Sequence, residues 1–135
     1  MKIMLDEKAI MPTRAHDTDA GIDLYTPFSF AVEPHGFLKV NLGVHVQIPQ
    51  NCVGLITSKS GLMGKGITCR GTIDCGYTGP INAVVYNHSD SYYIFEEGDK
   101  VTQLVVLPCI LAPLELVDSL DETERGDGGF GSTGK

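Results

Sequence analysis

The chain has 135 residues, of which 17 are acidic and 10 are Lys or Arg, so its formal net charge is -7 at pH 7. This length predicts one domain with its own hydrophobic core. The acidic balance argues against broad contact with nucleic acid or an anionic membrane, because both attract an excess of positive charge. Any phosphate group that the protein binds must therefore meet cations gathered locally.

Targeting signals and cysteine chemistry narrow the class further. No apolar run approaches the length of a membrane span, and Asp6 and Glu7 come too early for a signal peptide. We therefore predict a cytoplasmic location. The four cysteines have neither CxxC spacing nor a nearby His to complete a zinc site, which favours reduced, mostly buried thiols over a structural metal.

Short apolar or alternating runs recur along the chain between Gly, Pro, Asn and Asp, and almost none has helical period. This pattern predicts an all-β sandwich or barrel, with a jelly roll as the natural candidate. Residues 60–65 are the one interval that suits a short helical turn. The chain turns polar near its end, which predicts a β domain over 1–118 and a flexible, Gly-rich C-terminal arm over 119–135. The expected strands are residues 3–5, 28–32, 37–40, 44–48, 53–56, 81–86, 92–95, 101–107 and 114–117.

Two loop clusters in the first half carry candidate ligand-binding residues. Asp23 lies at the edge of an apolar run, where it could orient a metal-bound water or fix a basic neighbour, although Asp-rich loops also form turns. Residues 58–62 combine two hydroxyls, Lys59 and a glycine directly after a predicted strand. A helical turn that starts here presents free N–H groups to an anion, while Ser60 could equally be a plain N-cap.

Two further clusters lie in the second half. Residues 71–79 place a carboxylate, Asp74, and an aromatic ring, Tyr77, in one tight turn. Asp74 could reach a water or a sugar hydroxyl while Tyr77 lies against the sugar, but a solvated Asp and a packed Tyr in an ordinary hairpin explain the segment as well. Lys100 and Gln103 bracket the start of a strongly apolar run, which alone could be a simple strand entry.

The most informative segment is residues 125–134, in which five glycines are interleaved with Arg125, Phe130, Ser132 and Thr133. Glycine lets backbone N–H groups turn toward a polyphosphate, Arg supplies matching charge, and a lone aromatic ring suits a flat base. Composition alone favours a disordered Gly/Ser tail. The two hydroxyls, the guanidinium and the ring are not required by a passive linker.

In this order, the five segments closely resemble those of the trimeric dUTP pyrophosphatases (dUTPases), over about residues 15–133. The resemblance implies a distorted jelly-roll subunit in a homotrimer, with each active site assembled from neighbouring subunits. It also implies Mg²⁺-dependent hydrolysis of dUTP to dUMP and pyrophosphate, which removes a uracil source from DNA synthesis and supplies a thymidylate precursor.

The resemblance implies roles for individual residues. Asp74 would hold the attacking water, and Tyr77 would pack under the deoxyribose and exclude a 2′-hydroxyl. Backbone groups of the hairpin would read uracil. Asp23 matches an acid near the phosphates and the metal, acting through water, because Mg²⁺ is bound mainly by the phosphates. The implied substrate-binding set is Lys59, Ser60, Gly61, Gly71, Asp74, Tyr77, Ile81, Gln103, Arg125, Phe130, Gly131, Ser132 and Thr133, with Asp74, Gln103 and Ser60 as its catalytic members.

Two positions depart from the family pattern, and two other functions stay open. Lys59 and Lys100 stand where the family commonly has Arg, and Lys keeps the charge but loses the planar fork. A dCTP deaminase shares the fold but needs an acid or base at the cytosine amine, for which the sequence offers no obvious residue. A regulator could use the same nucleotide pocket as a switch for a protein partner, although nothing in the sequence indicates one.

Overall fold

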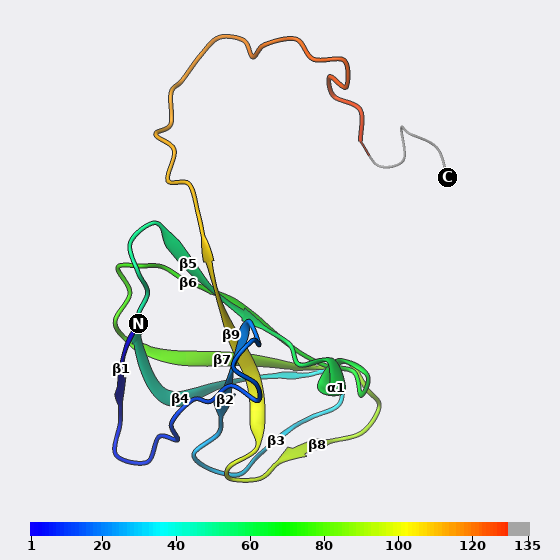
Figure 1. The fold of residues 1–135 in the computed structure, drawn as a ribbon. Helices are drawn as coiled ribbons and strands as arrows, with labels where there is room; N and C mark the ends of the chain where they lie inside the picture. The colour runs from blue at the N-terminus through cyan, green and yellow to red at the C-terminus, as the bar shows by residue number, and fades with distance from the viewer. Residues whose placement is uncertain (130–135) are drawn as a thin grey trace.

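The computed structural model describes residues 1–129, which contain nine strands and one single-turn helix (Figure 1). The predicted all-β class is confirmed. The elements are β1 (Lys2–Leu5), β2 (Gly21–Tyr25), β3 (Phe30–Val32), β4 (Phe37–Gln47), β5 (Cys52–Thr57), α1 (Ser60–Met63), β6 (Ile67–Ile73), β7 (Pro80–Asn87), β8 (Tyr93–Phe95) and β9 (Lys100–Pro108).

Seven of these strands form one curled sheet in the order β1-β4-β7-β6-β5-β9-β2, and β3 pairs with β8 in a separate two-stranded sheet. Every pairing is antiparallel. The strands enclose the core as a jelly roll does, with α1 at one end of the sheet (Figure 1). One face of the sheet therefore packs against the core, and loops at its ends remain free to form a ligand site.

The core forms because alternate side chains on the long strands point inward. On β7, Ile81, Ala83 and Val85 are all fully buried, while the two residues between them are half-buried. The other fully buried large side chains lie on β2, β3, β4, β6, β8 and β9: Leu24, Val32, Val40, Leu42, Val44, Ile67, Phe95, Val101 and Leu104.

Most strand limits differ from the predicted ones by one or two residues, and three differences are larger. The two runs 37–40 and 44–48 join into the single strand β4, because Gly43 has a φ of 66° and allows the pairing with β7 to shift register without ending the strand. Strands β2 and β6 were not predicted. Gly71 lies in β6, so the hairpin turn begins only at Asp74.

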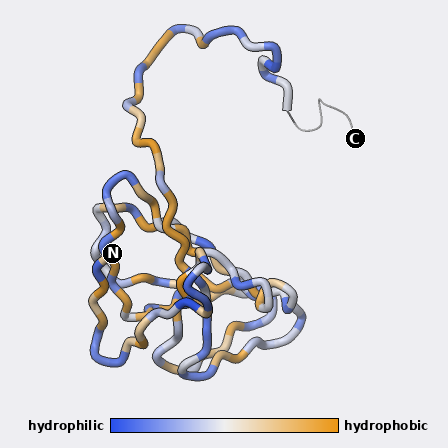
Figure 2. The backbone as a smooth tube through the Cα atoms, in the orientation of Figure 1, coloured by the Kyte–Doolittle hydropathy of each residue, from blue (hydrophilic) through white to orange (hydrophobic). Residues whose placement is uncertain are grey.

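The strand predicted at residues 114–117 is wrong. After Pro108 the structure assigns no strand or helix up to residue 129, and Leu114 and Leu116 are fully exposed. The segment leaves the sheet at the end of β9, so no neighbouring strand is within reach to pair with it (Figure 1). Its apolar stretches are visible in Figure 2. The predicted boundary at residue 118 stays a prediction, but regular structure already ends at Pro108.

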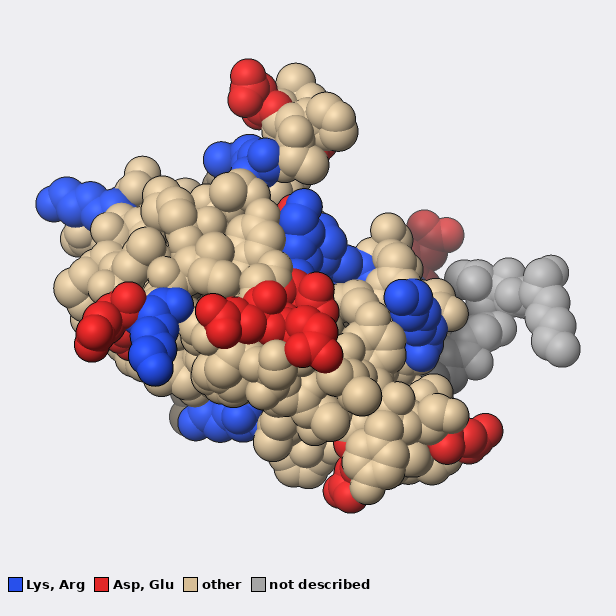
Figure 3. Space-filling view, turned by 90° about the horizontal axis from the view of Figure 1, so that it is seen from below, with Lys and Arg blue, Asp and Glu red and all other residues tan. Residues whose placement is uncertain are grey.

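Within residues 1–129, no helix is both long and apolar enough to cross a membrane. All four cysteines are free thiols. Cys69 is buried, whereas Cys52, Cys75 and Cys109 are only partly buried, so the expected burial holds fully for one of them. On the face shown in Figure 3, Lys and Arg form separate patches among acidic side chains rather than one basic surface.

Candidate functional site

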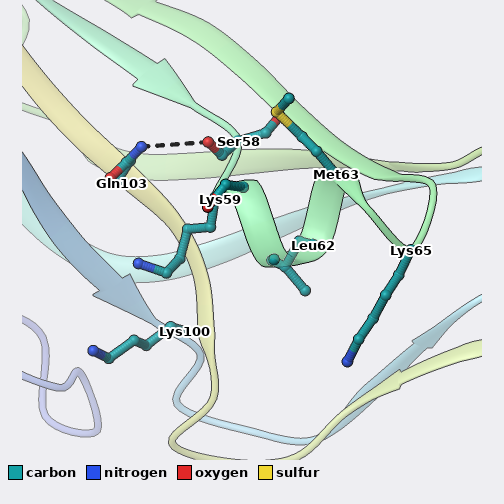
Figure 4. A pocket seen from close by; sticks show the side chains of 9 residues that line it. Ser58, Lys59, Leu62, Met63, Lys65, Lys100 and Gln103 are labelled. Atoms are coloured by element: carbon teal, nitrogen blue, oxygen red, sulfur yellow. Dashed lines mark hydrogen bonds between the residues drawn. The ribbon is translucent and has the colours of Figure 1, made fainter.

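A hollow of about 510 Å³ lies beside α1, where β5 and β9 meet the helical turn (Figure 4). Its lining combines three ammonium groups with an amide and two hydroxyls. Such a lining suits an anionic ligand, because the cations are gathered in one place on an otherwise acidic protein. The lining residues are Ser58, Lys59, Ser60, Gly61, Leu62, Met63, Lys65, Lys100 and Gln103.

The helical turn opens its first amides toward this hollow. Lys59 occupies the N-cap position with extended backbone and makes no side-chain cap, so Ser60 is the first helical residue and the alternative of Ser60 as N-cap is wrong. Among the described residues, the N–H groups of Ser60 and Gly61 have no hydrogen-bond acceptor. A side chain at Gly61 would meet open space. The turn therefore leaves room for a ligand directly against its backbone.

Asp23 organises the cations of the hollow. It is buried on β2, and its two carboxylate oxygens form ion pairs with different partners: Oδ1 with the Lys59 ammonium and Oδ2 with Lys100 Nζ at 2.7 Å. Burial by itself raises the pKa of Asp23, but hydrogen bonds from Lys100 and Lys59 outweigh it and hold the pKa below the ordinary value. In turn, Asp23 raises the pKa of Lys100. Of the two roles weighed for Asp23, fixing a basic neighbour is the one that this geometry provides.

Gln103 is placed by three neighbouring strands. On β9 it lies opposite Asp23 of β2 and Thr57 of β5, and its Nε2 donates a hydrogen bond to the Ser58 carbonyl at 3.3 Å (Figure 4). Its amide also lies over Gly21, where a Cβ atom would collide with Gln103 Oε1. Glycine at position 21 thus makes space for the Gln103 side chain at the edge of the hollow.

The hairpin between β6 and β7 forms a second hollow, of about 210 Å³. Asp74 and Tyr77 both line it, and the Tyr77 N–H donates to the Asp74 carbonyl at 3.0 Å. The Tyr77 hydroxyl donates to the Pro80 carbonyl at 2.9 Å, which fixes the ring across the turn. A Cβ atom at Gly79 would lie 2.6 Å from that hydroxyl, so the closely apposed ring requires glycine there. The carboxylate of Asp74 is exposed.

One chain does not bring the two hollows together. They share no residue, and they lie at opposite ends of β6, which runs for seven residues from the α1 end to the hairpin. At about 3.3 Å per residue, roughly 20 Å separates the two ends. Lys59, Ser60, Gly61 and Gln103 therefore form one group, and Asp74 and Tyr77 form another.

The remaining predicted site residues fall outside both hollows. The Ile81 side chain is fully buried in the core, so only its backbone can meet a ligand, and Gly71 lies within β6. Arg125 is exposed, and its Nε donates to the Gly128 carbonyl at 3.0 Å. Phe130, Gly131, Ser132 and Thr133 lie outside the described residues.

Lys65 lines the cationic hollow but was not among the predicted site residues. It follows α1, and its Nζ lies 5.6 Å from the centre of the Tyr93 ring on β8, which orients the side chain. Its position six residues after Lys59, across a single helical turn, was the only sequence signal.

The described residues do not form a site for a protein-held metal ion. Between residues 1 and 129, no group of three or more His, Cys, Asp or Glu side chains could hold one. Asp23 has an ammonium group at each carboxylate oxygen, and a divalent cation there would compete with two positive charges. The predicted magnesium role of Asp23 gains no support from this geometry.

The fold and the two hollows define an all-β protein that pairs a cationic turn with a carboxylate-bearing hairpin. The dUTPase family model matches residues 7–134. A deoxyuridine 5′-triphosphate nucleotidohydrolase of Clostridium tetani is 39% identical over 136 residues, which cover 98% of this chain and 94% of the relative. The chain belongs to the dUTPase family.

Solved structures agree with this membership. The Staphylococcus bacteriophage 80alpha dUTPase with dUpNHpp matches with a TM-score of 0.92 and 30% identity, covering 99% of this chain and 98% of that one. A mutant dUTPase of S. aureus phage phi11, in which a structural Mg(II) ion is coordinated, matches with a TM-score of 0.80 and 30% identity, covering 87% and 96%. The distorted jelly roll expected from the sequence is confirmed.

Proposed function

We propose that the protein hydrolyses dUTP to dUMP and pyrophosphate, as a dUTP diphosphatase. The observation that carries the proposal is the separation of two complementary half-sites, a cationic turn and a carboxylate hairpin, on opposite ends of one strand. Membership of the dUTPase family and the dUpNHpp bound by the related phage enzyme support the choice of nucleotide.

The triphosphate binds in the hollow beside α1. Lys59, Lys65 and Lys100 neutralise phosphate charge there, and the free amides of Ser60 and Gly61 donate to phosphate oxygens. Asp23 keeps two of the ammonium groups in place before the ligand arrives, so little is lost in ordering them. Gln103 contacts the phosphate chain or the attacking water from β9.

The nucleoside binds at the hairpin. Tyr77 packs against the deoxyribose and leaves no space for a 2′-hydroxyl, and backbone groups between Gly71 and Ile81 read uracil. Asp74 accepts a proton from a water and aligns it for attack on the α-phosphorus. The bond from the α-phosphorus to the bridging oxygen breaks, and pyrophosphate leaves. The exposed carboxylate of Asp74, beside the fixed Tyr77 ring, is consistent with this role.

A homotrimer with shared sites joins the two halves. The hairpin of one subunit supplies Asp74 and Tyr77 to the α1 hollow of its neighbour, and the arm over 119–135 folds over the nucleotide with Arg125 and Phe130. The segment between β9 and the arm supports this assembly, because a folded chain rarely leaves so many large apolar side chains in water. The exposed members of that segment are Ile110, Leu111, Leu114, Leu116 and Val117.

Magnesium enters as part of the substrate. A Mg²⁺ ion carried by the triphosphate needs no carboxylate from the protein, which agrees with the two ion pairs that already occupy Asp23. The phi11 enzyme coordinates a structural Mg(II) ion, which supports magnesium binding in the family but not a site for it on the substrate. In the cell, the reaction would limit uracil in DNA and supply dUMP for thymidylate synthesis, in the predicted cytoplasmic location.

A pyrophosphate-release assay with dUTP, dCTP, dTTP and UTP in the presence of Mg²⁺ tests the proposal. We expect release from dUTP alone at an appreciable rate, because the hairpin backbone rejects an exocyclic amine and Tyr77 rejects ribose. Ammonia release from dCTP would indicate the deaminase instead. Tight dUTP binding without turnover would indicate the regulator.

A further inference from the structure

His45 links the hairpin of residues 74–79 to the N-terminal part of the chain. It lies on β4, opposite Pro80 at the start of β7, and its side chain is only 15% exposed. Its two ring nitrogens face oxygen atoms of different segments. Nδ1 lies 2.8 Å from the Thr78 carbonyl oxygen, and Nε2 lies 3.2 Å from Oδ1 of Asp6.

Both contacts require a proton on the ring nitrogen. A carbonyl oxygen and an ionised carboxylate only accept hydrogen bonds, so Nδ1 and Nε2 must each donate. The protonated ring of His45 carries two N–H groups and satisfies both acceptors. The neutral ring carries one, so it leaves a lone pair facing either Thr78 or Asp6.

The groups around the ring favour its protonated form. The hydrogen bond to the Thr78 carbonyl raises the pKa of His45, burial opposes it, and Asp6 raises it again, so the pKa lies above its ordinary value. The charged groups on the β1 side are Asp6 and Lys2, and Lys2 lines a hollow of about 300 Å³ next to the ring. On the β7 side the ring meets the Thr78 carbonyl, and His45 pairs with Pro80, neither of which titrates.

We propose that His45 is a positioning residue: its protonated ring anchors Thr78, and thereby holds Tyr77 and Asp74 where they meet the nucleoside. Tyr77 directly precedes Thr78, and its hydroxyl donates to the Pro80 carbonyl. His45 and Pro80 therefore together fix the part of the hairpin that leads into β7. When His45 loses its proton, Asp6 and Thr78 compete for one N–H, and the hairpin loosens.

The consequence for catalysis rests on the proposed function, whereas the coupling between His45 and the hairpin does not. As pH rises through the His45 pKa, the KM for dUTP should increase about 3- to 10-fold, the range expected for the loss of one hydrogen bond. The kcat should change less, because a bound nucleotide itself holds the hairpin in place.

Asp6→Asn separates the protonation state of His45 from its contact with Thr78. The carboxamide of Asn can donate to Nε2 of the neutral ring, which keeps the hydrogen on Nδ1 and therefore keeps the Thr78 contact at high pH. His45→Leu removes the contact at every pH. Asp90→Asn is the matched control, because Asp90 makes the same kind of contact with His35, at 2.8 Å, beyond the far end of β7.

The test is an NMR titration of the ligand-free protein, followed by KM measurements for dUTP from pH 6 to 9 on the same variants. We expect the amide signals of Thr78 and Gly79 to shift with the midpoint of the His45 ring in the wild type and in Asp90→Asn. In Asp6→Asn, the amide shifts of Thr78 and Gly79 should disappear, and so should the rise in KM with pH. Titration of the substrate itself affects all variants equally, so each KM is compared with the wild-type KM at the same pH.

Hairpin amides that do not follow His45, or an Asp6→Asn variant that keeps the wild-type pH dependence, would overturn the inference. Because Asp6 is half exposed, Asp6→Asn decides the question even if His45→Leu fails to fold. A protein that keeps the coupled titration but does not hydrolyse dUTP would refute the proposed function and leave the coupling established.

Discussion

Ser60 and Asp74 lie beyond opposite ends of β6: Ser60 begins the helical turn that precedes the strand, and Asp74 follows its last residue. The seven extended residues of β6 between the turn and the hairpin span roughly 20 Å. A water held by Asp74 and a phosphate held near Ser60 must be in contact for hydrolysis. The proposed reaction therefore needs the hairpin of one subunit and the helical turn of another.

Replacing Tyr77 tests how the sugar is read. In Tyr77→Ala, the ratio of kcat/KM for dUTP to that for UTP should narrow by about tenfold or more, because the ring no longer blocks a 2′-hydroxyl. Tyr77→Phe keeps the ring and loses only the hydrogen bond to Pro80, so it should retain most of the preference. An unchanged ratio in Tyr77→Ala would mean that another group reads the sugar.

Removing the charge of Asp23 tests the pairing with Lys59 and Lys100. Near neutral pH, Asp23→Asn should lower the free energy of unfolding by about 1–2 kcal/mol, less than for a fully buried pair because Lys100 is partly exposed. The pKa of Asp23 is lower in the folded protein than its ordinary value of 3.8. The stabilisation by its charge is therefore fully present above about pH 3.8 and is lost as the pH falls through the folded pKa.

Urea unfolding of the wild type and of Asp23→Asn at a series of pH values measures the difference in their free energies of unfolding. It should shrink below pH 3.8. Asp17→Asn, at an exposed carboxylate with no ion pair in the described part of the chain, is the control and should differ from wild type by less than about 0.5 kcal/mol. A difference that does not depend on pH would assign the effect to packing.

Truncation after Leu120 tests the C-terminal arm. The truncated protein should keep its oligomeric state and its free energy of unfolding within about 0.5 kcal/mol, because residues 121–129 are almost entirely exposed. Its turnover of dUTP should fall by about 100-fold or more, through loss of Arg125 and the Gly-rich segment. Glu122→Gln in full-length protein should have no effect. Near-normal turnover after truncation would make the arm a simple linker.

The fold class could be predicted from the sequence because turn residues punctuate short apolar runs, and that signal is local. Strand β6 escaped notice because Gly71 stands where its alternation calls for an apolar side chain. Pairing with β5 and β7 forms the strand in spite of this gap. The run at 114–117 misled for the opposite reason: its side chains are apolar, but the chain offers it no strand to pair with.

Site residues could be predicted as types but not as partners. The sequence marks Asp23, Lys59 and Lys100 as separate charges, and only the adjacency of β2, β5 and β9 brings them into contact. The anchoring of Thr78 by His45 likewise depends on strands that are 33 residues apart in the chain. Neither relationship leaves a periodic or compositional trace.

The proposed catalytic role of Asp74 gives the starting point for the central test. Asp74→Asn should lower turnover of dUTP by about 1000-fold or more, because an amide cannot accept the proton of the attacking water, while dUpNHpp should still bind. Ser60→Ala should lower turnover by about tenfold or more and should fold normally, since the Ser60 side chain is exposed. Asp74→Asn leaves the helical turn intact, and Ser60→Ala leaves the hairpin intact, so each variant lacks one half of the proposed site.

Turnover by oligomers assembled from an equal mixture of Asp74→Asn and Ser60→Ala chains measures most directly whether two subunits build one site. Random association gives about a quarter of the sites an intact hairpin from one chain and an intact turn from another, so activity should rise to about that fraction of wild type. A mixture of Asp74→Asn with Tyr77→Ala is the control, because no hairpin in it is intact and activity should stay at the level of the parents. A mixture of Asp74→Asn and Ser60→Ala whose activity stays at the mean of its two parents would contradict a shared site.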